Sequence, residues 1–196
     1  MIVPDDAIIV VSGLPRSGTS MMMNVLTAGG LTAMTDQIRA ADIDNPKGYY
    51  EFERVKKLPQ GDTAWLEEAS GKCVKVISAL LPFLPPSYTY RVIFMHRQLE
   101  EVMESQRKML EHRNQTVKQD DNMASLLQQH VEDVRQWLVT QPNIALLDCD
   151  YNSMLATPEF WVDRINSFLG KSLDPIAMLS AVDFTLYRNR VGDNVK

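Results

Sequence analysis

The sequence has little of several things that particular classes of protein require. It contains two cysteines, Cys73 and Cys149, which form neither a metal-binding spacing nor a disulfide framework. Both lie in apolar, strand-like runs, so we expect two buried thiols. No stretch approaches the ~20 consecutive apolar residues that span a bilayer, and the first residues lack the basic segment of a secretion signal. We therefore expect a soluble, cytoplasmic protein with no membrane partner.

An excess of basic residues is also missing. The chain has 20 Lys and Arg against 25 Asp and Glu, which gives a formal net charge of -5 at pH 7. This balance argues against general binding to nucleic acid, which requires a basic surface. Any anion site must therefore be local. A length of 196 residues with 45% hydrophobic content predicts a single domain that covers residues 1–196.

What the sequence does contain is an alternation of strand-like and helix-like segments. The runs predicted as strands cover 7–13, 73–78, 91–96 and 143–150. The segments predicted as helices cover about 18–28, 99–112, 123–138 and 157–170, while 31–72 is predicted to form loops and short helices. Continuous apolar strands are typical of a parallel sheet that is buried on both faces. We therefore expect an α/β fold in which a parallel β-sheet lies between two layers of helices, as in P-loop nucleotide triphosphatases.

The stretch "VSGLPRSGTSMMMNVL" (11–26) places a turn rich in glycine, proline and serine between the first strand and the first helix. Gly13 and Gly18 have the spacing of a nucleotide P-loop, whose backbone N–H groups converge on an anion at a helix N-terminus. Thr19 stands where such loops carry the lysine that neutralises the β- and γ-phosphates. Arg16 is the one cation within the loop. The loop thus predicts an anion site and disfavours a kinase or triphosphatase.

The segment "PRSGTS" resembles the 5'-phosphosulfate-binding loop of the PAPS-dependent sulfotransferases, whose motif is Pro-Lys/Arg-Ser-Gly-Thr-Ser/Thr. Their donor is 3'-phosphoadenosine 5'-phosphosulfate (PAPS), and their fold is a P-loop-like parallel sheet wrapped by helices. The resemblance implies that Arg16 meets the phosphosulfate, while Thr19 and Ser20 hold the 5'-phosphate. The donor-binding loop that it implies consists of Pro15, Arg16, Ser17, Gly18, Thr19 and Ser20.

The donor of this family carries a second phosphate, on the 3'-oxygen, and the sequence offers residues for it. The family uses an arginine at a strand end and a serine eight residues later, and "RVIFMHRQLEEVMESQ" supplies Arg97 and Ser105 at this spacing. The planar guanidinium group of Arg97 suits bidentate contact with a phosphate. The tail "LYRNRVGDN" resembles a basic segment that touches the same phosphate, so Arg188 and Arg190 are further candidates.

Sulfuryl transfer requires cations for the charge on the moving group and a base for the acceptor proton, but no metal. Arg16 is one cation, and Lys75 resembles the lysine that follows the family's central strand. The cytosolic branch has a histidine two residues after that lysine, where this sequence has Ile77. In "NPKGYYE" (45–51), Glu51 resembles the glutamate base of the branches that act on carbohydrates or tyrosyl proteins. Glu51 is therefore our candidate base, and His96 is the second choice.

These features predict a sulfotransferase that moves a sulfuryl group from PAPS to the hydroxyl of a small molecule or carbohydrate. Two alternatives stay open: a P-loop phosphotransferase, in which Asp148 would bind a metal, and a nucleotide-binding module without activity. In the cytosolic branch a tryptophan after the loop stacks on adenine, and Met21 takes its place here. The acceptor and the oligomeric state, monomer or homo-oligomer, cannot be read from the sequence.

Overall fold

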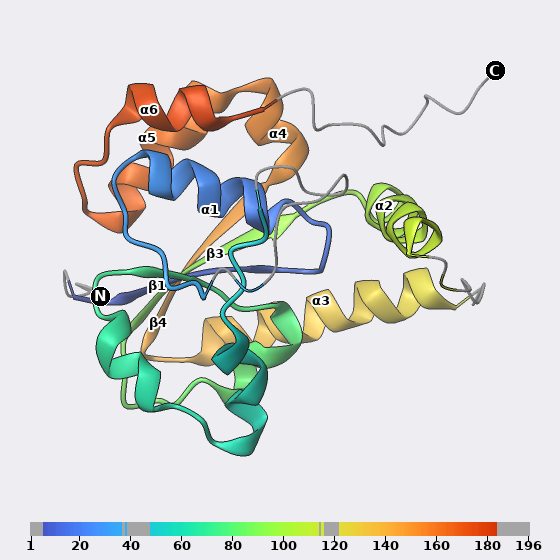
Figure 1. The fold of residues 1–196 in the computed structure, drawn as a ribbon, viewed down its shortest axis with the longest axis horizontal. Coiled ribbons are helices and arrows are strands. Elements are labelled where there is room, and N and C mark those ends of the chain that lie inside the picture. The colour runs from blue at the N-terminus through green and yellow to red at the C-terminus, as the bar shows by residue number, and fades with distance from the viewer. Residues whose placement is uncertain (1–5, 37, 39–47, 114, 116–121, 184–196) are drawn as a thin grey trace.

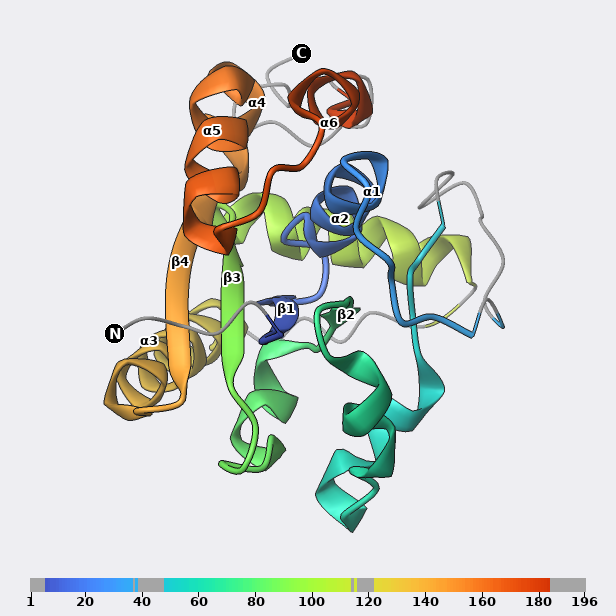
Figure 2. The same cartoon turned by 90° about the vertical axis from the view of Figure 1, so that its left-hand side faces the viewer.

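A parallel sheet of four strands in the order β2-β1-β3-β4 forms the centre of the computed structural model, which describes residues 6–36, 38, 48–113, 115 and 122–183. Figure 2 shows the strands side by side in this order. The strands are β1 (Ile8–Gly13), β2 (Cys73–Lys75), β3 (Tyr90–His96) and β4 (Ile144–Asp150). All the strand pairs are parallel. The predicted α/β fold class is therefore confirmed, although β2 is shorter than the predicted strand at 73–78.

The α-helices are α1 (Thr19–Ala28), α2 (Leu99–His112), α3 (Met123–Thr140), α4 (Tyr151–Ala156), α5 (Pro158–Leu169) and α6 (Pro175–Ala181). The short 3-10 helices are η1 (Glu53–Gln60), η2 (Ala64–Ala69) and η3 (Ser78–Phe83). Helices α4 and α6 were not predicted, because helices of six and seven residues are too short to show a helical period. No helix in the described part of the chain is long and apolar enough to cross a membrane.

Alternate residues of each strand enter two separate cores. Ile9 and Ile93 pack in one core with α1, α4, α5 and α6, above the sheet in Figure 1. Val10 and Val92 pack in the other core, with the 3-10 helices and α3 below the sheet. Because both faces of the sheet are covered, its strands are apolar at nearly every position instead of at every second one.

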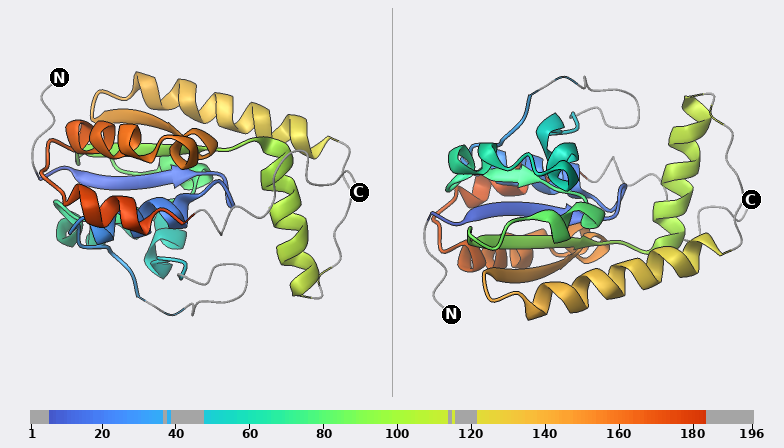
Figure 3. Two further views of the ribbon diagram at one scale, coloured as in Figure 1. Left: turned by 90° about the horizontal axis from the view of Figure 1, so that it is seen from above. Right: turned by 90° about the horizontal axis from the view of Figure 1, so that it is seen from below.

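The strand order determines where a ligand can bind. From β1 the chain passes to β2 on one side and then returns to β3 on the other side. The loops after β1 and β3 therefore diverge, and open parallel sheets bind ligands at the carboxyl ends of such a strand pair. Helix α2 crosses this end of the sheet, as both views in Figure 3 show. The fold thus brings the glycine-rich loop after β1 close to the segment that follows β3.

The two cysteines give a first test of this packing. Cys73 and Cys149 are both 0% exposed, and burial raises the pKa of each thiol to about 12. Since the thiolate is the reactive form, we expect neither cysteine to react with a disulfide reagent in the folded protein at mildly alkaline pH. Both should react once a denaturant unfolds the chain. Rapid modification of either thiol without denaturant would contradict this packing.

Candidate functional site

The loop after β1 adopts a backbone conformation that requires both of its glycines. Gly13 and Gly18 have φ angles of 141° and 98°. A Cβ on Gly13 would lie 2.6 Å from the carbonyl oxygen of Met95, and one on Gly18 would lie 2.4 Å from the ring of Tyr151. Arg16, which also has a positive φ of 74°, adopts a conformation that costs about 1–3 kcal/mol in a residue with a side chain. Contacts of Arg16 with other elements must offset this strain.

Two of those contacts join the loop to the segment after β3. Arg16 Nε donates a hydrogen bond of 2.9 Å to Ser105 Oγ on α2, across 89 positions of sequence. Arg97 Nη1 donates a bond of 3.2 Å to the backbone carbonyl of Arg16. The structure therefore unites the two predicted phosphate sites in one place.

A buried network holds the side chain of Arg97. Its Nε donates to Glu101 Oε2 at 2.9 Å, and the two side chains are 7% and 1% exposed. Asn152 Nδ2 lies 3.2 Å and 3.3 Å from the two oxygens of the same carboxylate. The guanidinium carbon of Arg97 lies 4.6 Å from the centre of the Tyr151 ring. The network leaves Arg97 little freedom to rotate.

A cavity of about 550 Å³ opens at this end of the sheet. The cationic residues that line it are Arg16, Lys56, Lys75, Arg97, Lys108 and Arg113. The acidic residues among its described lining are Glu51 and Asp183. The cavity is thus strongly cationic in a chain whose net charge is negative. Such a local excess favours an anionic ligand.

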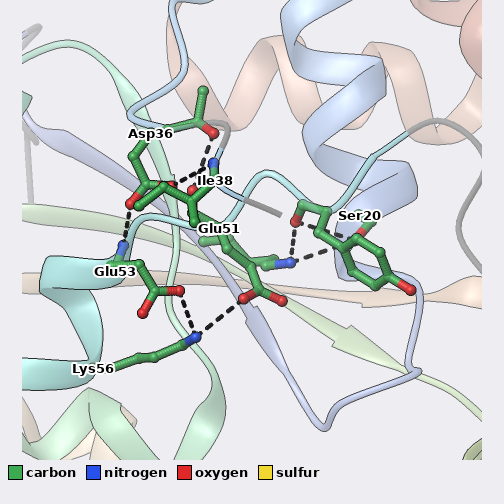
Figure 4. Close-up of polar contacts among 9 residues, drawn as sticks. Ser20, Asp36, Ile38, Glu51, Glu53 and Lys56 are labelled. Atoms are coloured by element: carbon green, nitrogen blue, oxygen red, sulfur yellow. Dashed lines mark hydrogen bonds and ion pairs between the residues drawn. The ribbon is translucent and has the colours of Figure 1, made fainter. Parts of the chain in front are cut away.

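Lys75 and Glu51, which are predicted to act in catalysis, both line this cavity. Lys75 Nζ donates to the carbonyl oxygen of Tyr49 and, at 3.5 Å, to Ser20 Oγ. Glu51 Oε2 lies 3.2 Å from Lys56 Nζ, and Figure 4 shows the carboxylate of Glu51 facing that amine. Lys75 therefore links the start of α1 to the segment that carries Glu51.

Most residues of the predicted site line the same cavity. They are Pro15, Arg16, Gly18, Thr19, Ser20, Glu51, Lys75, Arg97 and Ser105, and Met21 lies with them. Ser17 does not line the cavity: it is buried, and its hydroxyl has no hydrogen-bond partner among the described residues. Arg188 and Arg190 lie outside the described residues.

Comparison with known proteins adds to this geometry. No family model matches the sequence, and no curated protein is significantly similar to it. One similar structure is the sulfotransferase domain of the Synechococcus PCC 7002 olefin synthase, at 14% identity and a TM-score of 0.52, covering 95% of this chain and 81% of that one. Mouse sulfotransferase SULT7A1 complexed with PAP is similar at 18% identity and a TM-score of 0.57, covering 98% and 70%. This chain has the sulfotransferase fold. At such low identity the likeness concerns the fold alone.

Within this sulfotransferase fold, His96 lies apart from the cavity. His96 Nε2 is 2.5 Å from Asp148 Oδ1, and Arg135 donates to both oxygens of Asp148, at 3.0 Å and 2.7 Å. Burial alone would raise the pKa of Asp148, but the bonds from His96 and Arg135 outweigh it and lower this pKa to about 2. His96, the second candidate for the base, and Asp148, the metal ligand of the phosphotransferase alternative, are thus in contact with each other. No group of three or more metal-ligating side chains occurs in the described ranges.

The sequence analysis missed several residues of the site. Lys108 and His112 on α2 and Arg113 directly after it also line the cavity. Their spacing of three, seven and eight positions from Ser105 places them on one helical face. That spacing would have revealed them once Ser105 was assigned. The burial of Glu101 has no comparable signal, because acidic residues early in a helix are usually exposed.

The buried network provides a prediction on stability. Replacing Glu101 with alanine leaves the charge of Arg97 buried beside Tyr151, so Glu101→Ala should lower the free energy of unfolding by about 3 kcal/mol. Glu104→Ala, on the same helix, removes a pair with the more exposed Arg107 and should change stability much less. Equal effects in denaturant titrations of the two variants would show that the Arg97–Glu101 pair is not buried as described.

Proposed function

We propose that this protein transfers a sulfuryl group from PAPS to the hydroxyl group of an acceptor, which yields PAP and a sulfate ester. The observation that carries the proposal is the contact of Arg16 with Ser105 beside Arg97. This contact brings two segments that are predicted to bind anions into one cavity, and PAPS carries two anionic groups, a 5'-phosphosulfate and a 3'-phosphate. A mouse sulfotransferase of similar fold was solved with PAP, which supports this choice of nucleotide.

The residues present suit such a donor. We assign the 5'-phosphosulfate to the loop after β1, through Arg16, Thr19 and Ser20, whose backbone lies at the N-terminus of α1. We assign the 3'-phosphate to Arg97 and Ser105, since hydrogen bonds from a charged guanidinium group to a phosphate are strong. Arg188 and Arg190 stay predicted as additional ligands of that phosphate.

Two cations and one carboxylate would then carry the chemistry. The donor supplies the sulfuryl group, whose bond to a 5'-phosphate oxygen breaks as the acceptor oxygen bonds to sulfur. Arg16 and Lys75 would stabilise the negative charge that grows on the departing phosphate. Glu51 would accept the proton of the acceptor hydroxyl.

Lys56 keeps Glu51 ready for that role. A cation 3.2 Å from the carboxylate favours its charged form, the form that accepts a proton. The pKa of Lys56 is itself raised, first by its hydrogen bond to Glu53 and also by Glu51. Because the Lys56 side chain is 57% exposed, solvent screens the pair.

The phosphotransferase alternative has less support. It needs a metal-binding acid, and Asp148 is already bonded to His96 and Arg135. It also needs a cation at the position of Thr19. A nucleotide-binding module without activity stays an alternative that activity measurements decide. The cytoplasmic location and the single domain over residues 1–196 stay predictions.

Calorimetric titration tests the donor site. We expect PAP to bind without metal, and more tightly than adenosine 5'-phosphate or ATP with magnesium. Arg97→Gln keeps a hydrogen-bond donor near Glu101 but removes the positive charge. It should lower the affinity for PAP about 10–100-fold, since a charge-assisted hydrogen bond contributes about 1.5–3 kcal/mol. Adenosine 5'-phosphate lacks the 3'-phosphate and should lose much less affinity, because Arg97 affects it only through the bond to the backbone of Arg16.

The matched control is Arg107→Gln, the same substitution at an arginine of α2 whose side chain is 44% exposed. It should leave both affinities unchanged. If Arg97→Gln loses affinity for PAP and for adenosine 5'-phosphate by the same factor, the assignment of the 3'-phosphate is refuted. ATP binding that depends on magnesium and exceeds that of PAP would favour the phosphotransferase.

The role of Glu51 has a separate test. Glu51→Gln should lower kcat for sulfuryl transfer about 10²–10⁴-fold, because a general base contributes about that much, while PAP affinity stays near the wild-type value. Glu53→Gln is the control, since Glu53 also pairs with Lys56 but does not line the cavity. If Glu51→Gln retains full kcat, another group is the base. If the wild-type protein and Glu51→Gln both bind PAP and neither has activity, the protein is a binding module.

A further inference from the structure

We propose that the acceptor carries its hydroxyl on an apolar body, as an aliphatic alcohol or a phenol does, and not on a sugar. This inference rests on the proposed function, in which Glu51 and Lys75 mark the position of the reacting hydroxyl. It follows from the side chains that surround those two residues in the cavity. Their chemistry decides which body fits beside the hydroxyl.

An apolar wall adjoins the proposed base. Phe52 directly follows Glu51, and Ile77 lies two positions after Lys75. Met109 lies one helical turn beyond Ser105 on α2. Together with two neighbours these residues line the cavity, and we call the five of them its apolar wall: Phe52, Val55, Ile77, Leu80 and Met109.

The core behind this apolar wall holds much of it in place. The ring of Phe52 meets that of Trp65 edge to face, with their centres 5.4 Å apart. Val55 is buried in the core below the sheet, and Leu80 packs against the same core. Ile77 is still 38% exposed. A preformed apolar surface that stays partly open to water gains free energy when an apolar ligand covers it.

A sugar would find few partners at this wall. Each sugar hydroxyl that loses water must gain a hydrogen bond, or its burial costs free energy. The carboxylate and amide side chains of the described lining are Asn24, Glu51 and Asp183. Asn24 is already bonded to the carbonyl of Ala181 and to the hydroxyl of Tyr50. Glu51 is reserved for the reacting hydroxyl, and the lysines and arginines of the described lining can donate hydrogen bonds but cannot accept them. The hydroxyls of a sugar would therefore find few side-chain acceptors beside the apolar wall.

Direct binding tests the inference without any donor. We would titrate the protein with β-naphthol and with methyl glucoside, and separately with PAP. β-Naphthol should bind measurably and methyl glucoside should not. Met109→Gln keeps the size of the side chain. This variant and Ile77→Asn should each lower the affinity for β-naphthol about tenfold, as small changes in apolar pockets do. Their PAP affinity should stay within about twofold of wild type, since neither residue is assigned to the donor.

Leu126→Gln is the matched control, because Leu126 is 58% exposed on α3 and does not line the cavity. It should leave every affinity unchanged, and thermal unfolding checks that each variant is folded. Methyl glucoside binding as tightly as β-naphthol, or β-naphthol binding unaffected by Met109→Gln and Ile77→Asn, overturns the inference. PAP binding without β-naphthol binding overturns it and leaves the proposed function standing. The expected β-naphthol results without PAP binding support the apolar acceptor site and refute the proposed donor.

Discussion

The guanidinium group of Arg97 is the point on which the site depends. It bonds to the backbone of Arg16 in the first loop, pairs with Glu101 on α2 and lies over the ring of Tyr151 at the start of α4. Three segments that are distant in sequence are thereby fixed to one side chain. Because the pair with Glu101 is buried, it must be fully hydrogen-bonded to be tolerated, and Asn152 supplies the additional donor.

The strand order explains why such a network can form. With β1 and β3 adjacent and parallel, their carboxyl ends lie together. The strained loop at Arg16 and the start of α2 then lie within hydrogen-bonding distance of each other. The same edge receives Lys75 from β2, so the cations converge although the chain as a whole is acidic. Their convergence gives the cavity a charge that the composition does not suggest.

Local chemistry made much of this predictable. The glycine spacing around Arg16 and the apolar runs of the strands predicted the loop and the parallel sheet. The spacing of Arg97 and Ser105 predicted a second anion-binding segment, and Ser105 lies within hydrogen-bonding distance of Arg16 in the first predicted segment. Glu101, Tyr151 and the cationic face of α2 were missed. Burial of a carboxylate, or contact of a ring with an arginine, depends on elements distant in sequence and leaves no local pattern.

By itself the sequence determined the fold class and the conformation of the glycine-rich loop, because strand burial and the backbone freedom of glycine are local properties. The tertiary structure alone decided that Arg16 meets Ser105, that Glu101 is buried, and that His96 is engaged with Asp148 away from the cavity. It also brought Phe52, Ile77 and Met109 to the lining of one cavity. These outcomes depend on which strands are neighbours and which helices cover their ends, and a local residue pattern does not specify that arrangement.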